Sequence, residues 1–416
     1  MRDIIDSAYL HRALKHFYGY DGFRPGQEEI ISEILQGKPV LAVLPTGAGK
    51  SICFQLPSLL IKGVTLVISP LISLMKDQAE ALTARGIPAA YLDSSLSGSE
   101  YGKILYDTLN KRCKFLYVAP ERLANPQFCS FAARAGITMV AVDEAHCVSQ
   151  WGRSFRRDYY NIPDFIARLP RRPLVAAFTA TATPEVRQDI LKRLRLDGAR
   201  IVVTGFDRPN LHFAVKRSAD KDREVLDFLE KHRGQCGIIY CATRSKVEEV
   251  TALLVRSGYT ALRYHAGLTP EERRENQNYF VSGRVQVIVA TNAFGMGIDK
   301  PDVRFVIHYN MPKDVESYYQ EAGRAGRDGQ KAECLLLYSR RDRDINTYLI
   351  GHGQPDLQCK EQEMRLLDKM ADYCHTSGCL RRYLLQYFGE QAPLQCGNCG
   401  SCDANKNATW RRFLNL

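Results

Sequence analysis

Short runs of apolar, mostly β-branched residues alternate with longer amphipathic segments along most of the chain. After a similar stretch at 40–44, the first series of runs lies at 66–69, 115–119, 140–143, 175–179 and 201–204. A second series lies at 237–241, 261–264, 285–290, 303–309 and 332–338. Buried strands of a parallel sheet show this continuous apolar pattern because helices cover both of their faces. The rhythm therefore predicts an α/β architecture built from β-α-β units.

The interval between the two series of apolar runs marks a predicted boundary between two lobes. Segment 205–210 lies there and contains Gly205 and Pro209, residue types that interrupt regular structure. Beyond Ser339 the strand pattern stops, and helical patterning follows at 361–373 and 380–388. We expect an N-terminal α/β lobe at 1–205, a second lobe at 206–339 and a small, mainly helical unit at 340–403. Residues 404–416 are expected to form a frayed tail or a truncated linker.

Composition and net charge indicate the class of partner that the protein binds. The 416 residues exceed what one hydrophobic core usually supports, and 45% of them are apolar and 25% charged, as in a globular protein. The formal net charge of +11 favours a polyanionic partner. Nucleic acid matches better than a membrane, because no basic amphipathic anchor stands out and the apolar stretch 64–75 is interrupted by Ser69 and Pro70.

The termini and the cysteines indicate the compartment. The first residues lack the apolar core and the cleavage site of a secretory signal. Thirteen cysteines, an odd number scattered through strand-like runs, fit buried thiols better than a disulfide framework. We therefore expect a protein of the reducing cytoplasm, associated with the nucleoid if the source is bacterial.

The segment Asp143-Glu144-Ala145-His146, at the end of an apolar run, is the most informative part of the chain. Its first carboxylate is placed to hold Mg²⁺, and its second to orient or deprotonate an attacking water. Upstream, Pro45-Thr46-Gly47-Ala48-Gly49-Lys50-Ser51 supplies a matching phosphate loop, although Leu44 replaces the first glycine of the full pattern. Its backbone N–H groups can surround phosphate oxygens, Lys50 adds a cation and Ser51 can ligate Mg²⁺. Together the two segments predict nucleoside triphosphate hydrolysis.

Segment 320–329 carries Arg324 and Arg327, which would share one face if the segment is helical. A planar guanidinium can bridge phosphate oxygens while negative charge shifts during phosphoryl transfer. Because these arginines come from the second lobe, hydrolysis would depend on lobe closure. A solvated basic face is the alternative interpretation.

Cys396, Cys399 and Cys402 stand at three-residue spacing near the end of the chain. Four thiolates satisfy a tetrahedral structural Zn²⁺ without an open position for catalysis. Cys379, Cys374 and His375 are the candidates for the fourth ligand. Cys53, Cys241 and Cys334 lie in apolar runs and are expected in the core instead.

Further segments give the chain a close resemblance to the RecQ family of superfamily 2 DNA helicases. Besides the acidic box and the arginine segment, the matching segments are 17–27, 69–78, 117–123, 146–156, 177–183, 240–244, 264–268, 290–300, 379–390 and 396–402. The match runs from about residue 10 to residue 403. The resemblance implies two tandem RecA-like lobes followed by a helical zinc-binding module, with Cys379 as the fourth zinc ligand.

The resemblance also implies roles for individual residues. ATP and Mg²⁺ would bind between the lobes, with Lys50, Asp143, Glu144, Arg324 and Arg327 in the catalytic roles given above. Tyr20 would stack on the adenine, Arg24 would lie beside the nucleotide and Gln27 would bond the adenine edge. The remaining expected nucleotide contacts are Thr46, Gly47, Ala48, Gly49, Ser51, Asp299 and Gln320. The expected nucleic-acid contacts are Ser69, Lys76, Arg122, Trp151, Phe155, Arg156, Thr243, His265 and Thr291.

The aromatic-rich stretch after the acidic box departs from the family pattern. Trp151 and Phe155 are placed to stack on unpaired bases, unless they merely fill the lobe core. The family usually reads W-G-H-D-F-R-P, whereas this chain has Arg153, Ser154 and Arg157 at the His, Asp and Pro positions. We therefore expect altered coupling between DNA and the ATPase.

The expected function is that of an ATP-dependent DNA helicase with 3′-to-5′ polarity, acting in recombination and repair. Single-stranded and tailed or forked DNA would be its substrates, and a single-stranded-DNA-binding protein is a candidate partner. RecQ proteins often carry a winged-helix domain and a further helical domain after the zinc module, whereas this sequence stops at Leu416. We therefore expect weak strand separation, and the alternatives are an RNA helicase, a translocase or DNA-stimulated ATPase, and a strand-annealing protein.

Overall fold

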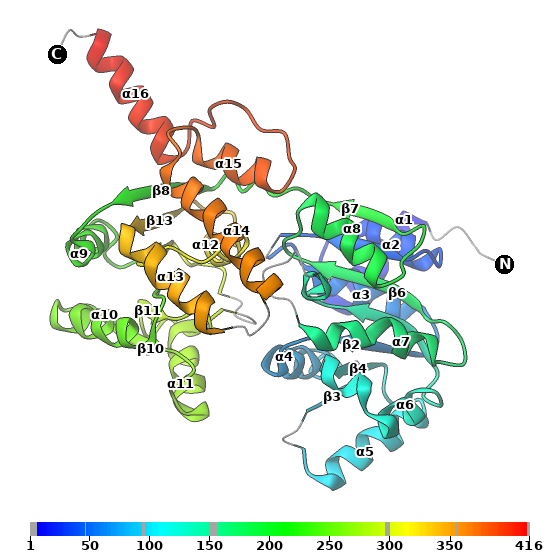
Figure 1. Cartoon of the computed structure of the whole chain (residues 1–416). Coiled ribbons are helices and arrows are strands. Elements are labelled where there is room, and N and C mark those ends of the chain that lie inside the picture. The colour runs from blue at the N-terminus through cyan, green and yellow to red at the C-terminus, as the bar shows by residue number, and fades with distance from the viewer. Residues whose placement is uncertain are drawn as a thin grey trace. The chain divides into compact units, whose positions relative to one another are not determined.

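The computed structural model describes residues 6–45, 47–93, 96–149, 156–295, 300–353 and 357–413, with side chains as far as residue 406. The chain divides into two compact units, Met1–Gly205 and Phe206–Leu416. In Figure 1 the first unit carries the colours from blue to green, and the second those from green to red. The second unit contains both a sheet and the helices that follow it along the chain.

The first unit is built on a seven-stranded parallel sheet in the order β3-β4-β2-β5-β6-β1-β7. Its strands are β1 (Val40–Val43), β2 (Val64–Ile68), β3 (Ala89–Leu92), β4 (Phe115–Val118), β5 (Ile137–Val142), β6 (Leu174–Thr179) and β7 (Arg200–Val203). Every residue of β1, β2 and β4 is buried. The continuous apolar runs thus form strands that are covered on both faces.

Helices connect these strands on both faces of the sheet (Figure 1). They are α1 (Ser7–Tyr18), α2 (Gln27–Leu35), α3 (Lys50–Leu60), α4 (Ile72–Thr83), α5 (Gly98–Leu109), α6 (Pro126–Ala132), α7 (Asn161–Ala167) and α8 (Pro184–Arg193). Short 3₁₀ helices are η1 (Pro120–Ala124), η2 (Ala145–Val148) and η3 (Arg157–Tyr160). Ile30 of α2, Phe54 of α3 and Met75 of α4 share one core with the strands. This packing fixes the loops at the carboxyl ends of β1, β2 and β5.

The second unit is built on a six-stranded parallel sheet in the order β10-β11-β9-β12-β13-β8. Its strands are β8 (Leu211–Arg217), β9 (Gly237–Tyr240), β10 (Ala261–Tyr264), β11 (Val287–Ala290), β12 (Phe305–His308) and β13 (Ala332–Tyr338). The connecting helices are α9 (Lys221–Lys231), α10 (Arg244–Arg256), α11 (Pro270–Val281) and α12 (Val315–Ala322). The predicted α/β class with two parallel sheets is therefore confirmed.

Four further helices complete the second unit: α13 (Arg340–Gly353), α14 (Leu357–His375), α15 (Leu380–Tyr387) and α16 (Gly400–Phe413). Helix α14 packs against α12 and α13, while α15 and α16 contact the edge strand β8. The helical region after the second sheet is thus docked onto that sheet. No helix in the described parts of the chain is both long and apolar enough to cross a bilayer.

The structure differs from the sequence prediction at three places. The strands β3 and β8 were missing from the predicted series because their composition is atypical of strands: β3 begins with two alanines, a residue type depleted in strands, and β8 contains His212, Lys216 and Arg217. Residues 404–413, expected as a frayed tail, instead continue α16 as helix.

Candidate nucleotide, nucleic-acid and metal sites

The phosphate loop lies between β1 and α3, at the carboxyl edge of the first sheet. Gly47 and Gly49 have φ values of 85° and 78°, in the left-handed region that favours glycine. Among the described residues, no side chain caps the start of α3, whereas Ser97 caps α5 and Thr183 caps α8. The backbone N–H groups at the start of α3 therefore form an anion-binding position, strengthened by the helix dipole.

Gln27 and Arg24 hold this loop from the side. The Gln27 amide donates to the carbonyl oxygens of Ala48, at 3.0 Å, and Gly49, at 3.2 Å, while its own oxygen accepts from the Arg24 N–H at 2.8 Å. The Arg24 guanidinium donates to the Gly47 carbonyl. In this structure Gln27 binds the loop backbone, and its contact with the adenine edge stays a prediction. Tyr20 is half exposed, as a base-stacking side chain must be.

The acidic box lies at the end of β5. The Lys50 Nζ lies 3.8 Å from the Glu144 Oε1, so the phosphate loop and the acidic box meet directly. Glu144 adopts φ 46° and ψ 46°, a left-handed conformation that is costly for a residue with a side chain. The surrounding fold therefore holds this carboxylate in one direction.

Asp143, like Glu144, is half-buried. Burial, followed by the neighbouring Glu144 carboxylate, raises the pKa of Asp143 to about 6, although Lys50 opposes the shift. Its Oδ2 accepts from the Ser69 hydroxyl at 3.4 Å, and its Oδ1 accepts from the Glu144 N–H at 2.9 Å. Asp143, Ser51 and Ser69 line one small cavity. A hard cation between the hydroxyl of Ser51 and the carboxylate of Asp143 would satisfy that charge, which fits the predicted Mg²⁺ ligands.

His146 is a residue whose role the sequence analysis did not assign. Its Nδ1 lies 2.8 Å from the Thr179 Oγ1 and 3.3 Å from the Glu144 Oε2, and the ring is buried. Thr179 in turn donates to the Thr181 carbonyl at 3.0 Å. His146 therefore connects the acidic box at β5 to the threonine segment that follows β6, and its position directly after Asp-Glu-Ala was the available signal.

In the second unit, Arg324 and Arg327 follow the end of α12 at Ala322 and lie in turns, so they do not share a helix face. Arg324 and Gln320 are buried, and Arg327 is half-buried. The Arg324 guanidinium donates to the carbonyl of Gly295, where φ is 138°. A Cβ on Gly295 would lie 2.3 Å from the guanidinium carbon, so this glycine makes the room for Arg324.

The described nucleic-acid candidates of the first unit follow the strand ends. Ser69 follows β2 but is buried, and its hydroxyl is directed at Asp143 rather than outward. Lys76 on α4 is about half exposed and lies 3.8 Å from the Glu80 carboxylate. Arg122 donates to the Asp93 carbonyl at 3.1 Å, and Arg156 to the Pro70 carbonyl at 3.2 Å. These arginines position neighbouring loops as well as adding positive charge.

Three candidates of the second unit lie after adjacent strands. Thr243 follows β9, His265 follows β10 and Thr291 follows β11, and these strands are neighbours in the sheet. Thr243 caps α10, and the Thr291 hydroxyl accepts from the Ala293 N–H at 3.4 Å. His265 is buried and its Nε2 lies 2.8 Å from the Glu248 Oε1, so it orders this edge rather than projecting from it. Thr46, Trp151, Phe155 and Asp299 lie outside the described residues.

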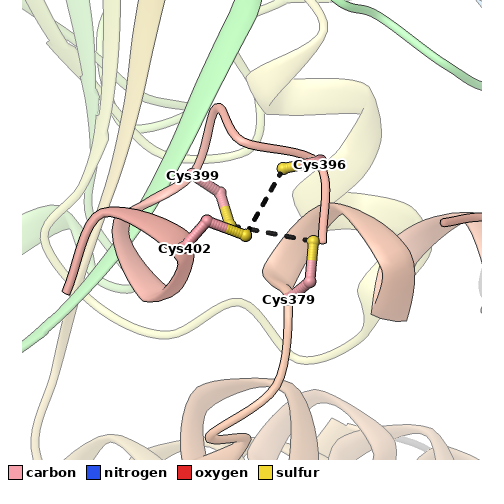
Figure 2. Close-up of side chains that lie close together, drawn as sticks. All are labelled: Cys379, Cys396, Cys399 and Cys402. Atoms are coloured by element: carbon pink, nitrogen blue, oxygen red, sulfur yellow. Dashed lines mark hydrogen bonds between the residues drawn. The ribbon is translucent and has the colours of Figure 1, made fainter. Parts of the chain in front are cut away.

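The four cysteines 379, 396, 399 and 402 converge in the second unit (Figure 2). Their sulfurs all lie within 4.8 Å of one another, with Cys396 and Cys402 4.0 Å apart and Cys379 and Cys399 3.9 Å apart. A tetrahedron of Zn–S bonds near 2.3 Å separates sulfurs by about 3.8 Å, so the arrangement fits zinc. Of the candidates for the fourth position, the structure brings Cys379 to the cluster, whereas His375 Nδ1 bonds the Ala371 carbonyl at 2.8 Å.

Backbone N–H groups donate to sulfurs of this cluster. The Asn398 N–H donates to the Cys396 sulfur at 3.3 Å, and the Arg382 N–H to the Cys379 sulfur at 3.5 Å. Burial raises the pKa of the Cys396 thiol to about 12 and also raises that of Cys402, whereas the hydrogen bonds that the Cys399 sulfur accepts outweigh its burial and bring its pKa down to about 7. Such N–H···S contacts orient the ligands of structural zinc sites.

Comparison with known families agrees with these sites. Residues 24–190 match the family described as DEAD/DEAH box helicase, and residues 220–329 match the helicase conserved C-terminal domain. Residues 340–403 match the family described as RecQ zinc-binding, which includes all four cysteines of the cluster.

Relatives match over nearly the whole chain. ATP-dependent DNA helicase RecQ of Bacillus subtilis is 46% identical over 96% of this chain and 68% of its own length. The protein of the same name from Pasteurella multocida is 42% identical over 92% of this chain and 61% of its own length. The chain thus spans about two thirds of the length of these relatives.

Solved structures of more distantly related proteins share the fold. The crystal structure of DUF1998 helicase MrfA bound to DNA matches 94% of this chain and 60% of that chain, with a TM-score of 0.67 and 18% identity. At this identity the likeness concerns the fold alone, which is that of two helicase lobes. The family matches, the cysteine cluster and the relatives together show that the chain belongs to the RecQ family of superfamily 2 helicases.

Proposed function

We propose that this protein is an ATP-dependent DNA helicase core that couples ATP hydrolysis to movement along single-stranded DNA and to duplex unwinding. The observation that carries the proposal is the meeting of Lys50 and Glu144, 3.8 Å apart, beside the uncapped start of α3. A phosphate-binding helix start, a cation and a water-orienting carboxylate are the parts that hydrolysis of a nucleoside triphosphate requires. Family membership supports ATP as the nucleotide and DNA as the polymer.

In this proposal the first unit holds the triphosphate. The N–H groups of the phosphate loop and the Lys50 ammonium neutralise the β- and γ-phosphates. Glu144 orients a water and accepts its proton as the water oxygen bonds to the γ-phosphorus and the bond to the ADP oxygen breaks. Ser51 and Asp143 would hold Mg²⁺, which would supply positive charge to the phosphate oxygens. Tyr20 and Arg24 contact the base and its surroundings.

The second unit completes the reaction in the proposal. Arg324 and Arg327 bridge phosphoryl oxygens when the units close, and Gln320 and Asp299 contact the nucleotide from the same side. When the units open after product release, Thr243, Thr291 and the first-unit arginines change their contacts with the sugar–phosphate chain. Such contacts do not depend on the base sequence, so they suit a protein that moves along any strand.

The decisive experiment measures ATP turnover with and without single-stranded DNA, in the wild type and in Lys50→Ala and Glu144→Gln. We expect DNA-stimulated turnover in the wild type and a loss of about 10²–10³-fold in each variant, as removal of a preorganised charge-stabilising group usually costs. Glu144→Gln should still bind ATP, because the phosphate loop stays intact. Turnover in Glu144→Gln equal to that of the wild type would remove the assigned water-orienting residue.

A panel of nucleic acids tests the remaining parts of the proposal. We expect stimulation by single-stranded DNA to exceed that by RNA, and displacement of a strand from a 3′-tailed duplex to exceed that from 5′-tailed or blunt duplexes. Equal or stronger stimulation by RNA would identify an RNA helicase instead. Hydrolysis without displacement on any tailed or forked substrate would identify a translocase.

The cellular context is proposed from the family alone. It comprises DNA recombination and repair, action in the cytoplasm at the nucleoid if the source is bacterial, and cooperation with a single-stranded-DNA-binding protein. The net charge of +11 agrees with a DNA partner but distinguishes none of these settings. The domain bounds 206–339 and 340–403 likewise remain proposals within the second unit.

A further inference from the structure

The linker segment (residues 206–211) connects the end of the first unit's chain to β8 and lies wholly in the second unit. It has hydrogen bonds on two sides. One side faces the turns that carry Arg324 and Arg327, and the other faces the residues around the zinc-binding cysteines. The two candidate sites of the second unit meet at this segment.

On the first side, Arg208 and Asn210 bind the backbone of the arginine turns. The Arg208 guanidinium donates to the carbonyls of Gly323 at 3.3 Å, Ala325 at 3.0 Å and Gly326 at 3.0 Å. The Asn210 amide donates to the carbonyls of Gly326 and Gln330, both at 2.9 Å. A Cβ on Gly326 would lie 2.5 Å from the Asn210 amide nitrogen, so the fit is tight. These donors fix the backbone before and after Arg324.

On the second side, residues of the cysteine region bind the linker backbone. Arg381, two positions after Cys379, donates to the Asp207 carboxylate at 2.6 Å, to the Arg208 carbonyl at 2.6 Å and to the Leu211 carbonyl. Asn398, between Cys396 and Cys399, donates to the Pro209 carbonyl at 2.9 Å. Arg381 is only 5% exposed, so these charge-assisted bonds form away from water.

Packing reinforces the same connection. The Phe206 ring stacks on the Phe388 ring, with centroids 4.3 Å apart and planes at 11°. The Phe206 N–H donates to the Glu390 carboxylate at 2.8 Å, and the Tyr319 hydroxyl of α12 donates to the Phe206 carbonyl at 2.5 Å. The linker is therefore held simultaneously by α12, by the arginine turns and by the zinc-binding region.

We propose that Arg208 is a positioning residue for ATP hydrolysis: it sets the turns that carry Arg324 and Arg327, and the zinc-binding region holds Arg208 in place through Arg381 and Asn398. This inference rests on the proposed ATPase function. Arg208 touches no phosphate in this scheme and acts through the carbonyls of residues 323–326. A guanidinium suits the task because its planar fork presents donors to several carbonyls in one fixed geometry, whereas a lysine ammonium is a point charge on a flexible stem.

The test begins with Arg208→Gln, with Arg217→Gln as the matched control. Arg217 also lies near the cysteine region, where it donates to the Cys374 carbonyl at 3.3 Å, but among the described residues its guanidinium does not bind the arginine turns. We expect Arg208→Gln to lower kcat about 10²-fold, the usual cost of misplacing a catalytic group by about 1 Å, with little change in KM for ATP. Arg217→Gln should stay within about twofold of the wild type in kcat. An unchanged kcat in Arg208→Gln would overturn the inference.

A second measurement follows the backbone directly. Hydrogen exchange of amides 323–329 should increase in Arg208→Gln and not in Arg217→Gln, because only the first loses the bonds to that backbone. Extraction of zinc from the wild type should increase exchange at the same amides and at the linker segment. Unchanged exchange in either experiment would overturn the inference, even if the wild type hydrolysed no ATP and the proposed function itself failed.

A double-mutant cycle tests the connection to the cysteine region. The effects of Arg208→Gln and Arg381→Gln on kcat should be far from multiplicative, because both variants break one series of contacts. If the two effects on kcat are multiplicative, Arg381 does not act through Arg208, and the role of the zinc-binding region in the proposal is wrong. If Arg208→Gln fails to fold, Arg208→Lys takes its place in every measurement: it keeps the charge but loses the fork, so we expect reduced kcat without rescue.

Discussion

The phosphate-loop edge of the first unit and the cysteine cluster of the second unit are assembled in opposite ways. The first consists of backbone groups and charges that already have protein partners, such as Lys50 with Glu144 and Gln27 with the loop carbonyls. The second consists of four thiols that have mainly each other and a few N–H groups. The difference teaches that the nucleotide site is formed by the fold itself, whereas the cysteine cluster needs its metal for cohesion.

The largest expected effect comes from breaking the metal site. Cys399→Ser should release zinc and remove a binding free energy on the order of 10 kcal/mol that stabilises the region around it. Metal analysis and limited proteolysis of residues 340–403 would measure this, and nucleotide binding by the first unit should persist. Cys374→Ser is the matched control, because Cys374 is a buried neighbour outside the cluster. Full zinc content in Cys399→Ser would contradict the assignment and, with it, the contrast between the two sites.

The next effect tests whether the first unit binds nucleotide by itself. Neutralising both arginines, in Arg324→Ala with Arg327→Ala, should lower kcat by about 10³–10⁵-fold, because arginines stabilise the transition-state charge of phosphoryl transfer. ATP affinity should change little. Gly295→Ala should mimic part of this loss while keeping both charges, since a Cβ there would displace the Arg324 guanidinium. Undiminished turnover in the double variant would refute the composite site.

A smaller effect concerns the free-energy cost of holding the ionised Asp143 carboxylate in the first-unit site. The folded-state pKa of Asp143 is raised to about 6 from its ordinary value of 3.8, so the folded protein binds the proton more tightly than the unfolded chain. Without Mg²⁺, stability should therefore fall as pH rises from about 4 to 6, by on the order of 2–3 kcal/mol, and stay lower above that range. Asp143→Asn should raise the melting temperature in EDTA at pH 8 and do so far less at pH 4. Equal shifts at both pH values would mean that the carboxylate carries no such cost.

The smallest effect tests how far protein partners stabilise the first unit. The buried Gln55 amide accepts from the Tyr18 hydroxyl at 3.1 Å and donates to Gln78 at 3.0 Å and to the Tyr117 hydroxyl at 3.1 Å. Gln55→Leu should destabilise the first unit by about 1–3 kcal/mol, because it leaves buried polar partners unsatisfied. Denaturant unfolding would measure it, with the exposed Gln235→Leu as control. A neutral result would show that this network is dispensable.

Much of the fold and of the sites was predictable from sequence because the signals are local. Strands at sheet centres read as apolar runs, and the phosphate loop, the acidic box and the Cys-x-x-Cys spacing each lie within a few residues. The strands β3 and β8 were not predictable in the same way, because the two alanines of β3 and the polar residues His212, Lys216 and Arg217 of β8 weaken the β-branched apolar pattern. The hydrophobic pattern of a segment reflects how deeply the segment is buried, so partly buried segments have weak patterns.

By itself, the sequence determined the two α/β lobes, the residues that can bind phosphate and the kind of metal that the cysteines can hold. The structure brings Cys379 to the cluster, as the resemblance implied, but the burial of Ser69 and His265 and the contact of Gln27 with the phosphate loop follow from the tertiary fold alone. It also decided that Arg208 connects the arginine turns to the zinc-binding region. The physical reason is that these outcomes depend on hydrogen bonds between residues far apart in the chain, and such bonds leave no periodicity or spacing in the sequence that would reveal them.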